Sequence, residues 1–402
     1  MSPADTAAER GTFDSLTEWW REARDREPVR FDETQQTWEL FGYSDITKAL
    51  FDPAGFSSDF SGLAPSQEDI DLFVKGDFTG IDPPRHRKLR NLASQAFTPR
   101  TVAAMEPRVS AILDDLLDQV EDPGRFDFVD AVTDPLPITV IAELLGIPPG
   151  DRATFRRWAA ILLGDNGLDE NSTPADIEAA MNVVAPTVRE MNEYLFAHIR
   201  RCRAAGGEDL TSKLVGAEVD GERLDDEEIL GFLGSLFSAG HVTVTALLSS
   251  LILLLDEYPE VAAELRARPG SRPGAVEEAL RFRPPFPRIG RRSTVDVELG
   301  GVVIPANSMV SLWVGSANRD VTRFTEPDRF DIHRSPNQHL TFGHGIHFCL
   351  GAPLARLEAA VVLEKLFARY GDLMVDPERP AELHNPWLIV GAKRLPLVGT
   401  PR

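Results

Sequence analysis

The chain has 402 residues, of which 43% are hydrophobic and 26% charged, as in globular proteins that bury a large core. Its net charge of −21 and pI near 4.8 exclude nucleic acid or an anionic membrane as the main partner, because both attract net positive surfaces. Two cysteines are too few for a disulfide scaffold, and residues 1–10 are polar without the apolar core of a signal peptide. We therefore expect a cytoplasmic protein with one domain over residues 1–402, of which roughly the first ten are flexible.

Helical spacing of apolar residues dominates the chain and predicts a mainly α-helical protein with a minor β portion. The expected helices cover residues 15–24, 44–50, 85–96, 101–120, 136–145, 151–163, 174–204, 229–255, 261–267, 274–282 and 353–369. Clusters of β-forming residues beside Gly and Pro predict strands at 37–40, 295–299, 301–304, 309–314 and 394–398.

Residues 229–255 contain no Asp, Glu, Lys or Arg and are long enough to cross a bilayer. Glycine, serine, threonine and histidine interrupt the segment, acids flank it on both sides, and it lacks basic flanks and an aromatic belt. We therefore interpret it as a long helix buried in a large domain, with no membrane contact.

The most informative stretch is residues 342–351, Phe-Gly-His-Gly-Ile-His-Phe-Cys-Leu-Gly. Its glycines let the backbone approach a flat ligand, and the positive end of the helix that follows favours a thiolate at Cys349. A single cysteine is more often an inert part of a core, but this context favours a metal ligand. Cys202 lies in a polar helix without such a context, and we assign it no role.

These residues resemble the haem-binding loop of the cytochrome P450 family, in particular the soluble bacterial members that oxidise secondary metabolites. Glu278 and Arg281 resemble the family's Glu-x-x-Arg pair, and Arg334 the second arginine of that cluster. Segments 317–320 and 327–328 fit the connecting region, and 82–90 resembles the helix whose His and Arg reach a haem propionate. The resemblance implies the P450 fold, with the long buried helix across the haem.

The resemblance also implies roles for individual residues. Cys349 is the expected iron ligand. Glu278 and Arg281 taken alone would be explained equally well as a solvated ion pair, but with Arg334 the resemblance implies a buried structural network. The other expected haem contacts are Phe342, Gly343, Gly351 and, at the propionates, His86, Arg90, Arg291 and His347. We choose Arg291 over Arg288 and Arg292 from its distance to the glycines at 300–301.

Ala239 and Gly240 lie four and three residues before Thr243, so all three share one face of the long helix. A threonine in an apolar helix usually makes only an internal hydrogen bond, but Ala-Gly-x-x-Thr resembles the family's oxygen-binding groove. The family usually has an acid directly before this threonine, and here that position is Val242. The path of the protons is thus left open; we expect Thr243 with ordered water or a polar group of the substrate to complete it.

Apolar residues near the expected haem face are candidate substrate walls, although each one taken singly is equally well explained as core. They are Phe232, Leu236, Phe237, Ile289, Leu388 and Ile389, with the loop 56–79 and segments 285–289 and 388–390.

The expected activity is a monooxygenase that hydroxylates or epoxidises a small organic molecule, a secondary-metabolite intermediate that is free or held on a carrier protein. Its expected cofactors are haem b and dioxygen. Because no flavin or nicotinamide motif is present, electrons from NAD(P)H are expected through a separate ferredoxin and ferredoxin reductase, with the basic residues of 85–90 and Arg356 as a docking surface. Three alternatives remain: an atypical or peroxide-driven oxidation, a non-catalytic auxiliary relative, and a metal-free helical binding protein.

Overall fold

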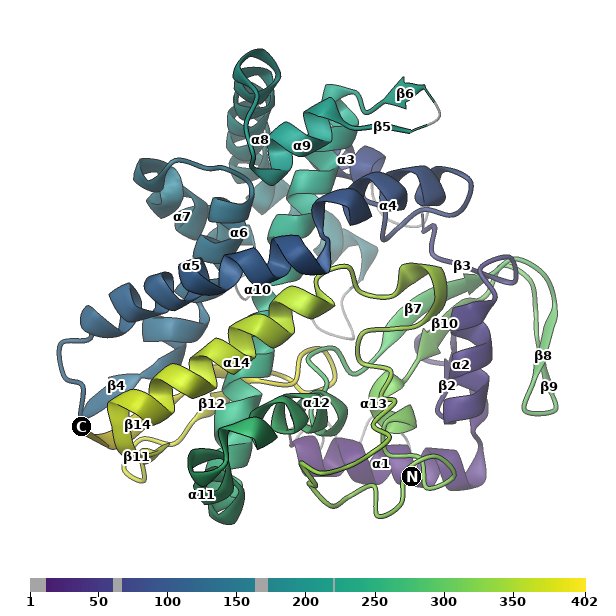
Figure 1. Ribbon diagram of the computed structural model, residues 1–402. Helices are drawn as coiled ribbons and strands as arrows, with labels where there is room; N and C mark the ends of the chain where they lie inside the picture. The colour runs from purple at the N-terminus through teal and green to yellow at the C-terminus, as the bar shows by residue number, and fades with distance from the viewer. Residues whose placement is uncertain (1–11, 61–66, 163–172, 220) are drawn as a thin grey trace. The chain divides into compact units, whose positions relative to one another are not determined.

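The protein is described by a computed structural model over residues 12–60, 67–162, 173–219 and 221–402 (Figure 1). The expected flexibility of residues 1–10 lies outside the described residues. The chain is mainly helical with a smaller strand portion, as predicted. It divides into two compact units. The first unit consists of Met1–Ser57, Leu113–Thr133 and Thr243–Arg402, and the second consists of Ser58–Ile112 and Asp134–Val242. The expectation of one domain over the whole chain stays a prediction.

The first unit contains the sheets and the C-terminal helices. Its described elements are α1 (Phe13–Arg26), β1 (Val29–Asp32), β2 (Thr37–Leu40), α2 (Tyr43–Phe51), β3 (Phe56–Ser57), β4 (Arg125–Asp127), a π-helical turn (Val129–Thr133), α11 (Pro259–Ala267), α12 (Arg272–Phe282), β7 (Ile289–Ser293), β8 (Val297–Leu299), β9 (Val302–Ile304), β10 (Met309–Leu312), α13 (Val314–Ala317), α14 (Ala352–Arg369), β11 (Tyr370–Val375), β12 (Glu382–Leu383), β13 (Ala392–Arg394) and β14 (Pro396–Pro401).

A five-stranded sheet in the order β1-β2-β10-β7-β3 supports the first unit. All its pairings are antiparallel except β10 with β2, and the register places Val310 opposite Arg291 and Trp38. Its apolar face packs on α2 through a core that includes Leu40, Ile46 and Leu312. A second sheet joins β11, β14 and β4. Cys349 lies in the segment between β10, in the first sheet, and β11, in the second.

In the part that the structure describes, the second unit is helical apart from one short hairpin. Its described elements are α3 (Glu68–Gly76), α4 (Arg85–Ala96), α6 (Pro135–Leu144), α7 (Arg152–Leu162), α8 (Pro174–Ala205), α9 (Leu210–Gly216), β5 (Glu218–Val219) and β6 (Glu222–Arg223). Helix α8 begins with a capping box in which the Thr173 side chain accepts from the Asp176 backbone and the Asp176 carboxylate accepts from the Thr173 backbone. Helix α5 (Pro99–Asp118) begins in this unit and ends in the first one.

The long helix α10 (Asp226–Glu257) also contributes to both units. Three acids in its first turn suit the positive end of a helix and explain why it starts before residue 229. By length and composition α10 could cross a membrane, but 61% of its most apolar window is buried inside the fold. That burial supports the interpretation as a core helix.

Several predicted boundaries and loops were wrong. Residues 56–79 are not one loop, since they contain β3 and α3. The strand expected at 309–314 ends at Leu312, because α13 begins at Val314. The strand expected at 394–398 falls across β13 and β14. Strand β7, which no alternating pattern marks, is formed by its pairing with β10 and β3.

Candidate active site

The cysteine loop is tightly folded against α2. The Cys349 backbone N–H donates to the Phe342 carbonyl at 2.8 Å, and the Gly343 N–H to the Leu340 carbonyl at 2.8 Å. Gly343 and Gly345 have φ values of +69° and +70°, which favour glycine. A Cβ on Gly345 would also lie 2.5 Å from the Leu50 carbonyl oxygen. The glycines predicted to shape this loop are therefore required by its backbone.

The surroundings of Cys349 fit the ligand of a haem iron. Its thiol is in no disulfide and is half-buried. A Cβ on Gly351 would lie 3.9 Å from the Cys349 sulfur, so position 351 directly adjoins the sulfur. Helix α14 starts directly after Gly351, with Pro353 in its first turn, and its positive end favours a thiolate.

Glu278, Arg281 and Arg334 form the buried network that the sequence predicts. Glu278 and Arg281 are fully buried, and the guanidinium Nε and Nη2 donate to the carboxylate at 2.8 and 2.7 Å. Arg334 Nε donates to the same carboxylate at 3.1 Å. The sequence missed a further donor, Asn337 Nδ2, at 3.0 Å from Glu278 Oε2. Every charge in this network is paired, which is the condition for burying it.

A chain of hydrogen bonds leads from this network to the cysteine loop. Arg281 Nη1 donates to the Asn318 carbonyl at 2.8 Å. The Asn318 side chain donates to Thr341 Oγ1 at 2.9 Å and accepts from the Leu340 N–H at 2.7 Å. Thr341 Oγ1 donates in turn to the Leu280 carbonyl at 2.6 Å. The network thus fixes the start of the loop whose end carries Cys349, and no local pattern marks Asn318 or Thr341 for this role.

A second ion cluster beside the loop also escaped the sequence analysis. Arg356 donates to Glu277 from Nε at 2.6 Å and from Nη2 at 2.8 Å, and its guanidinium lies 4.6 Å from the centre of the Phe342 ring. His339 Nε2 lies 3.3 Å from the same carboxylate. Burial opposes the ionisation of Glu277, but hydrogen bonds from Arg356 and His339 prevail and lower its pKa to about 2. Phe342 is therefore held by a cation on its face.

The candidate propionate ligands divide between the two units. On β7, Arg291 is buried, whereas Arg292 points to the other side of the strand and bonds Asn307, and Arg288 lies against Trp313. In the second unit, burial and then the neighbouring Arg90 lower the pKa of His86, so that its buried ring is neutral at pH 7. A buried guanidinium and a neutral imidazole both suit carboxylates as donors. The convergence of these groups and His347 on propionates stays a prediction.

Known proteins resemble this chain over nearly its whole length. A family model described as cytochrome P450 matches residues 273–396. The chain is 45% identical over 361 residues to the cyclomarin C epoxidase CymV of Salinispora arenicola, covering 90% of each chain. It is 43% identical over 394 residues to the erythromycin C-12 hydroxylase of Saccharopolyspora erythraea, covering 96% of this chain and 94% of that one. The chain belongs to the cytochrome P450 family.

A solved P450 structure extends the likeness to three dimensions. HmtN, a post-tailoring hydroxylase involved in himastatin biosynthesis, matches with a TM-score of 0.84 at 42% identity, covering 98% of this chain and 99% of that one. The protein is accordingly a P450 monooxygenase, an oxidoreductase that requires haem, dioxygen and a supply of electrons. The alternatives of a non-catalytic relative and of a metal-free binding protein are wrong.

The middle of α10 differs from the rest of this P450 helix in its exposure. Most of the helix is buried, but Leu236, Ala239, Gly240, Val242 and Thr243 are half-buried or exposed. Of these, Leu236, Ala239, Gly240 and Thr243 follow helical spacing on one side of the helix, whereas Val242 and the likewise accessible Ser235 and Ser238 lie on an adjoining side. A Cβ on Gly240 would lie 2.4 Å from Ile141 Cδ1, which gives this glycine a packing reason as well. The oxygen-side roles of Ala239, Gly240 and Thr243 stay predictions.

His241 lies away from the accessible side of α10. Its ring is buried, and Nε2 lies 2.8 Å from Asp134 Oδ1. The sequence placed His241 off the Thr243 face, and its partner Asp134, directly before α6, agrees with that. His241 is therefore engaged with Asp134 and does not replace the acid that Val242 lacks.

The candidate substrate walls are of two kinds. Phe232 and Phe237 are buried against Phe78 and Phe155, with ring centres 5.4 and 5.7 Å apart, as core residues are. Leu236, Ile289, Leu388 and Ile389 are only half-buried. The Val390 N–H donates to the Pro285 carbonyl at 2.9 Å, so the segments 285–289 and 388–390 do lie together. The second group is the better candidate for contact with a substrate.

The basic residues expected to bind a ferredoxin are largely paired within the protein. Arg85 lies 3.6 Å from Glu228, Lys88 pairs with Glu222, and Arg356 is bound to Glu277. The Arg85 and Lys88 pairs are surface pairs, which are weak and exchange readily, whereas Arg356 is held by two hydrogen bonds to Glu277. The structure therefore leaves the docking surface as a prediction.

Proposed function

We propose that this P450 hydroxylates or epoxidises a secondary-metabolite intermediate in the cytoplasm, with haem b held by the Cys349 thiolate. Relatives that match nearly the whole chain are named as an epoxidase, a hydroxylase and a post-tailoring hydroxylase, which supports both the reaction and the substrate class. The observation that carries the proposal is the half-buried Cys349 in a glycine-rich loop tied to the buried Glu278 network.

Each group of residues has one task in the proposed reaction. Bound haem supplies the activation of dioxygen, by which one oxygen atom enters the substrate and the other leaves as water. The Cys349 thiolate donates charge to the iron, and the α14 N-terminus stabilises that thiolate. His86, Arg90, Arg291 and His347 neutralise and orient the propionates. The apolar side chains around Ile289 and Ile389 keep water from the substrate.

Proton delivery rests on Thr243 in the proposed reaction. Val242 offers no proton where the family usually has an acid, and His241 is bound to Asp134. The Thr243 hydroxyl can accept a hydrogen bond from water or from a polar group of the substrate while donating its own proton. The substrate would then take part in its own oxidation by completing the hydrogen-bond chain.

Electrons would come from NAD(P)H through a ferredoxin reductase and a ferredoxin, and the substrate would arrive free or on a carrier protein. Oxidation of the same substrate supported by hydrogen peroxide alone would favour the atypical alternative.

Carbon monoxide added to the reduced protein tests the thiolate ligand. The wild type should give a band at about 450 nm, which is characteristic of thiolate-bound haem. Cys202→Ser, the matched control, should keep the band, and Cys349→Ser should lose it while retaining its helical content. A band of wild-type position and height in Cys349→Ser would overturn the proposal. Candidate metabolites that shift the Soret band are then tested for a product that has gained one oxygen atom.

A further inference from the structure

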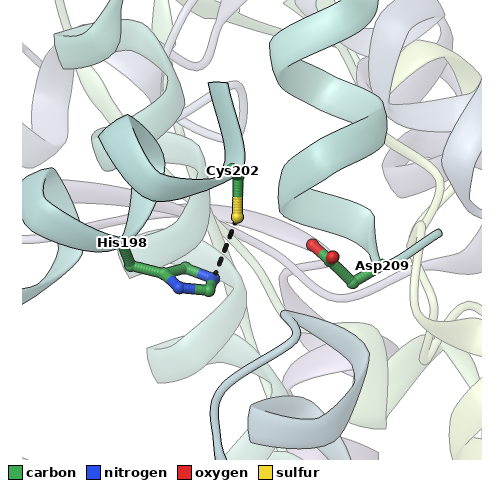
Figure 2. Close-up of side chains that lie close together, drawn as sticks. All are labelled: His198, Cys202 and Asp209. Atoms are coloured by element: carbon green, nitrogen blue, oxygen red, sulfur yellow. Dashed lines mark hydrogen bonds between the residues drawn. The ribbon is translucent and has the colours of Figure 1, made fainter. Parts of the chain in front are cut away.

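Three potential metal ligands converge in the second unit, outside the site described above. His198 and Cys202 lie four residues apart near the end of α8, so they share one face of that helix. Asp209 caps the start of α9. Figure 2 shows the three side chains directed toward one another from these two helices. His198 is 4% exposed and Cys202 is 8% exposed, which leaves little access for bulk water.

The distances between the donor atoms match a tetrahedral metal site. Cys202 Sγ lies 3.6 Å from His198 Nε2, and all three donor atoms lie within 4.8 Å of one another. In a tetrahedral zinc site, Zn–S of about 2.3 Å and Zn–N of about 2.1 Å place the sulfur and nitrogen about 3.6 Å apart. The Cys–His edge is thus already at the required length, and only Asp209 must move closer.

Neighbouring groups orient the ligands as outer-shell partners do. The Ser212 N–H donates to Asp209 Oδ1 at 2.8 Å, and the Ser212 hydroxyl donates to Oδ2 at 2.7 Å. Each carboxylate oxygen retains a second lone pair for a metal. The Leu145 carbonyl oxygen lies 2.9 Å from His198 Nε2 and accepts from Thr211 Oγ1 at 2.8 Å. A tetrahedral zinc site needs about 3.4 Å between a nitrogen and an oxygen ligand, so this oxygen becomes the fourth ligand once the contact lengthens by about 0.5 Å.

Besides the small shifts of Asp209 and of the Leu145 carbonyl, metal binding requires two changes in protonation. The metal must replace the proton by which His198 Nε2 bonds the Leu145 carbonyl, so the ring proton moves to Nδ1. Arg201 Nη2 lies 3.4 Å from Nδ1 and its guanidinium 5.7 Å from the centre of the Tyr194 ring, but the residue is exposed, so both contacts can be exchanged for water at low cost. Cys202 must lose its proton, after which one thiolate and one carboxylate balance a divalent cation.

We propose that His198, Cys202 and Asp209, with the Leu145 carbonyl, bind a zinc ion that joins the end of α8 to the start of α9. A sulfur and an imidazole select zinc over calcium or magnesium, which prefer oxygen ligands. Since the site forms only when both helices are folded, zinc would stabilise the second unit.

Zinc chloride, titrated calorimetrically into the haem-loaded, tag-free protein after chelator treatment, tests the site. The wild type should bind one zinc per chain and release protons, detected as an enthalpy that depends on the ionisation enthalpy of the buffer. His198→Ala and Cys202→Ser should lose this binding, and Ser212→Ala should bind roughly ten- to a hundredfold more weakly. His333→Ala, which removes an exposed histidine paired with Glu264, is the matched control and should bind like the wild type.

Zinc K-edge absorption identifies the ligands independently of the haem iron. The wild type should show one sulfur at about 2.3 Å, and Cys202→Ser should show none. Each variant is first checked for the carbon monoxide band, which reports a folded, haem-loaded protein. Absence of stoichiometric zinc from the wild type, a zinc shell without sulfur, or wild-type affinity in Cys202→Ser would each overturn the proposal.

Discussion

Replacing Glu358 with glutamine should remove a strong pH dependence of stability. Glu358 lies in α14, is 1% exposed, and its Oε2 has no hydrogen-bond partner among the residues that the structure describes. Burial raises its pKa to about 8, well above the ordinary value. The carboxyl group is therefore protonated at neutral pH in the folded protein and ionised in the unfolded chain.

The sign and size of the effect follow from this difference in bound protons. Between pH values of about 4.5 and 8, the folded state holds one proton more than the unfolded state, so the free energy of unfolding falls by about 1.4 kcal/mol per pH unit. By pH 7 the accumulated loss is about 3 kcal/mol. Below the ordinary pKa both states are protonated, and the loss disappears. Glutamine has a similar shape and no charge, so the variant lacks this slope.

Urea unfolding at pH 5.5, 6.5 and 7.5 measures the effect as a difference between variant and wild type, in which the other titrating groups cancel. The difference should grow with pH in favour of Glu358→Gln. Glu364→Gln, which changes an exposed carboxylate on the same helix, is the matched control and should show no such growth. A difference for Glu358→Gln that is constant across the three pH values would refute the reasoning.

Three further predictions address the network, a helix crossing and the oxygen side. Glu278→Ala leaves Arg281 and Arg334 buried without their carboxylate and should lower the free energy of unfolding in urea by about 3–5 kcal/mol. The control Glu326→Ala removes an exposed carboxylate and should cost less than about 1 kcal/mol. Equal costs for the two variants would contradict a buried network at Glu278. Gly231→Ala places a Cβ 2.5 Å from the Phe73 carbonyl oxygen and the Gly76 nitrogen, so it should cost at least about 1–3 kcal/mol in thermal unfolding. The control Gly216→Ala has open space around the added Cβ and should be neutral or stabilising. A wild-type melting temperature for Gly231→Ala would disprove the close crossing of α3 and α10. Thr243→Ala should lower the coupling, that is, the amount of product formed per reductant consumed. The control Thr245→Val removes a hydrogen bond to the Thr133 carbonyl and should affect stability alone. Unchanged coupling and rate in Thr243→Ala would remove Thr243 from the mechanism.

Local patterns in the sequence were sufficient to predict most helices and the cysteine loop. Helix α4 was predicted with its observed bounds, and α8 to within one residue at its end. These elements have strong apolar periodicity and clear termini, so neighbouring residues decide them. The glycines around Cys349 are also decided locally, because a positive φ and a close backbone contact both require glycine, which is visible in the sequence.

Only the tertiary structure decided which polar residues support the site. In the sequence only the distance to the glycines at 300–301 favours Arg291 over Arg288 and Arg292, whereas the register of β7 on β10 shows that Arg291 is buried. The hydrogen-bond chain through Asn318 and Thr341 joins residues that are far apart along the chain. In the sequence Glu358 is indistinguishable from the other acids of its helix, but its burial raises its pKa and keeps the carboxyl group protonated at neutral pH. Burial, pairing and pKa depend on contacts between distant segments, which a local pattern does not encode.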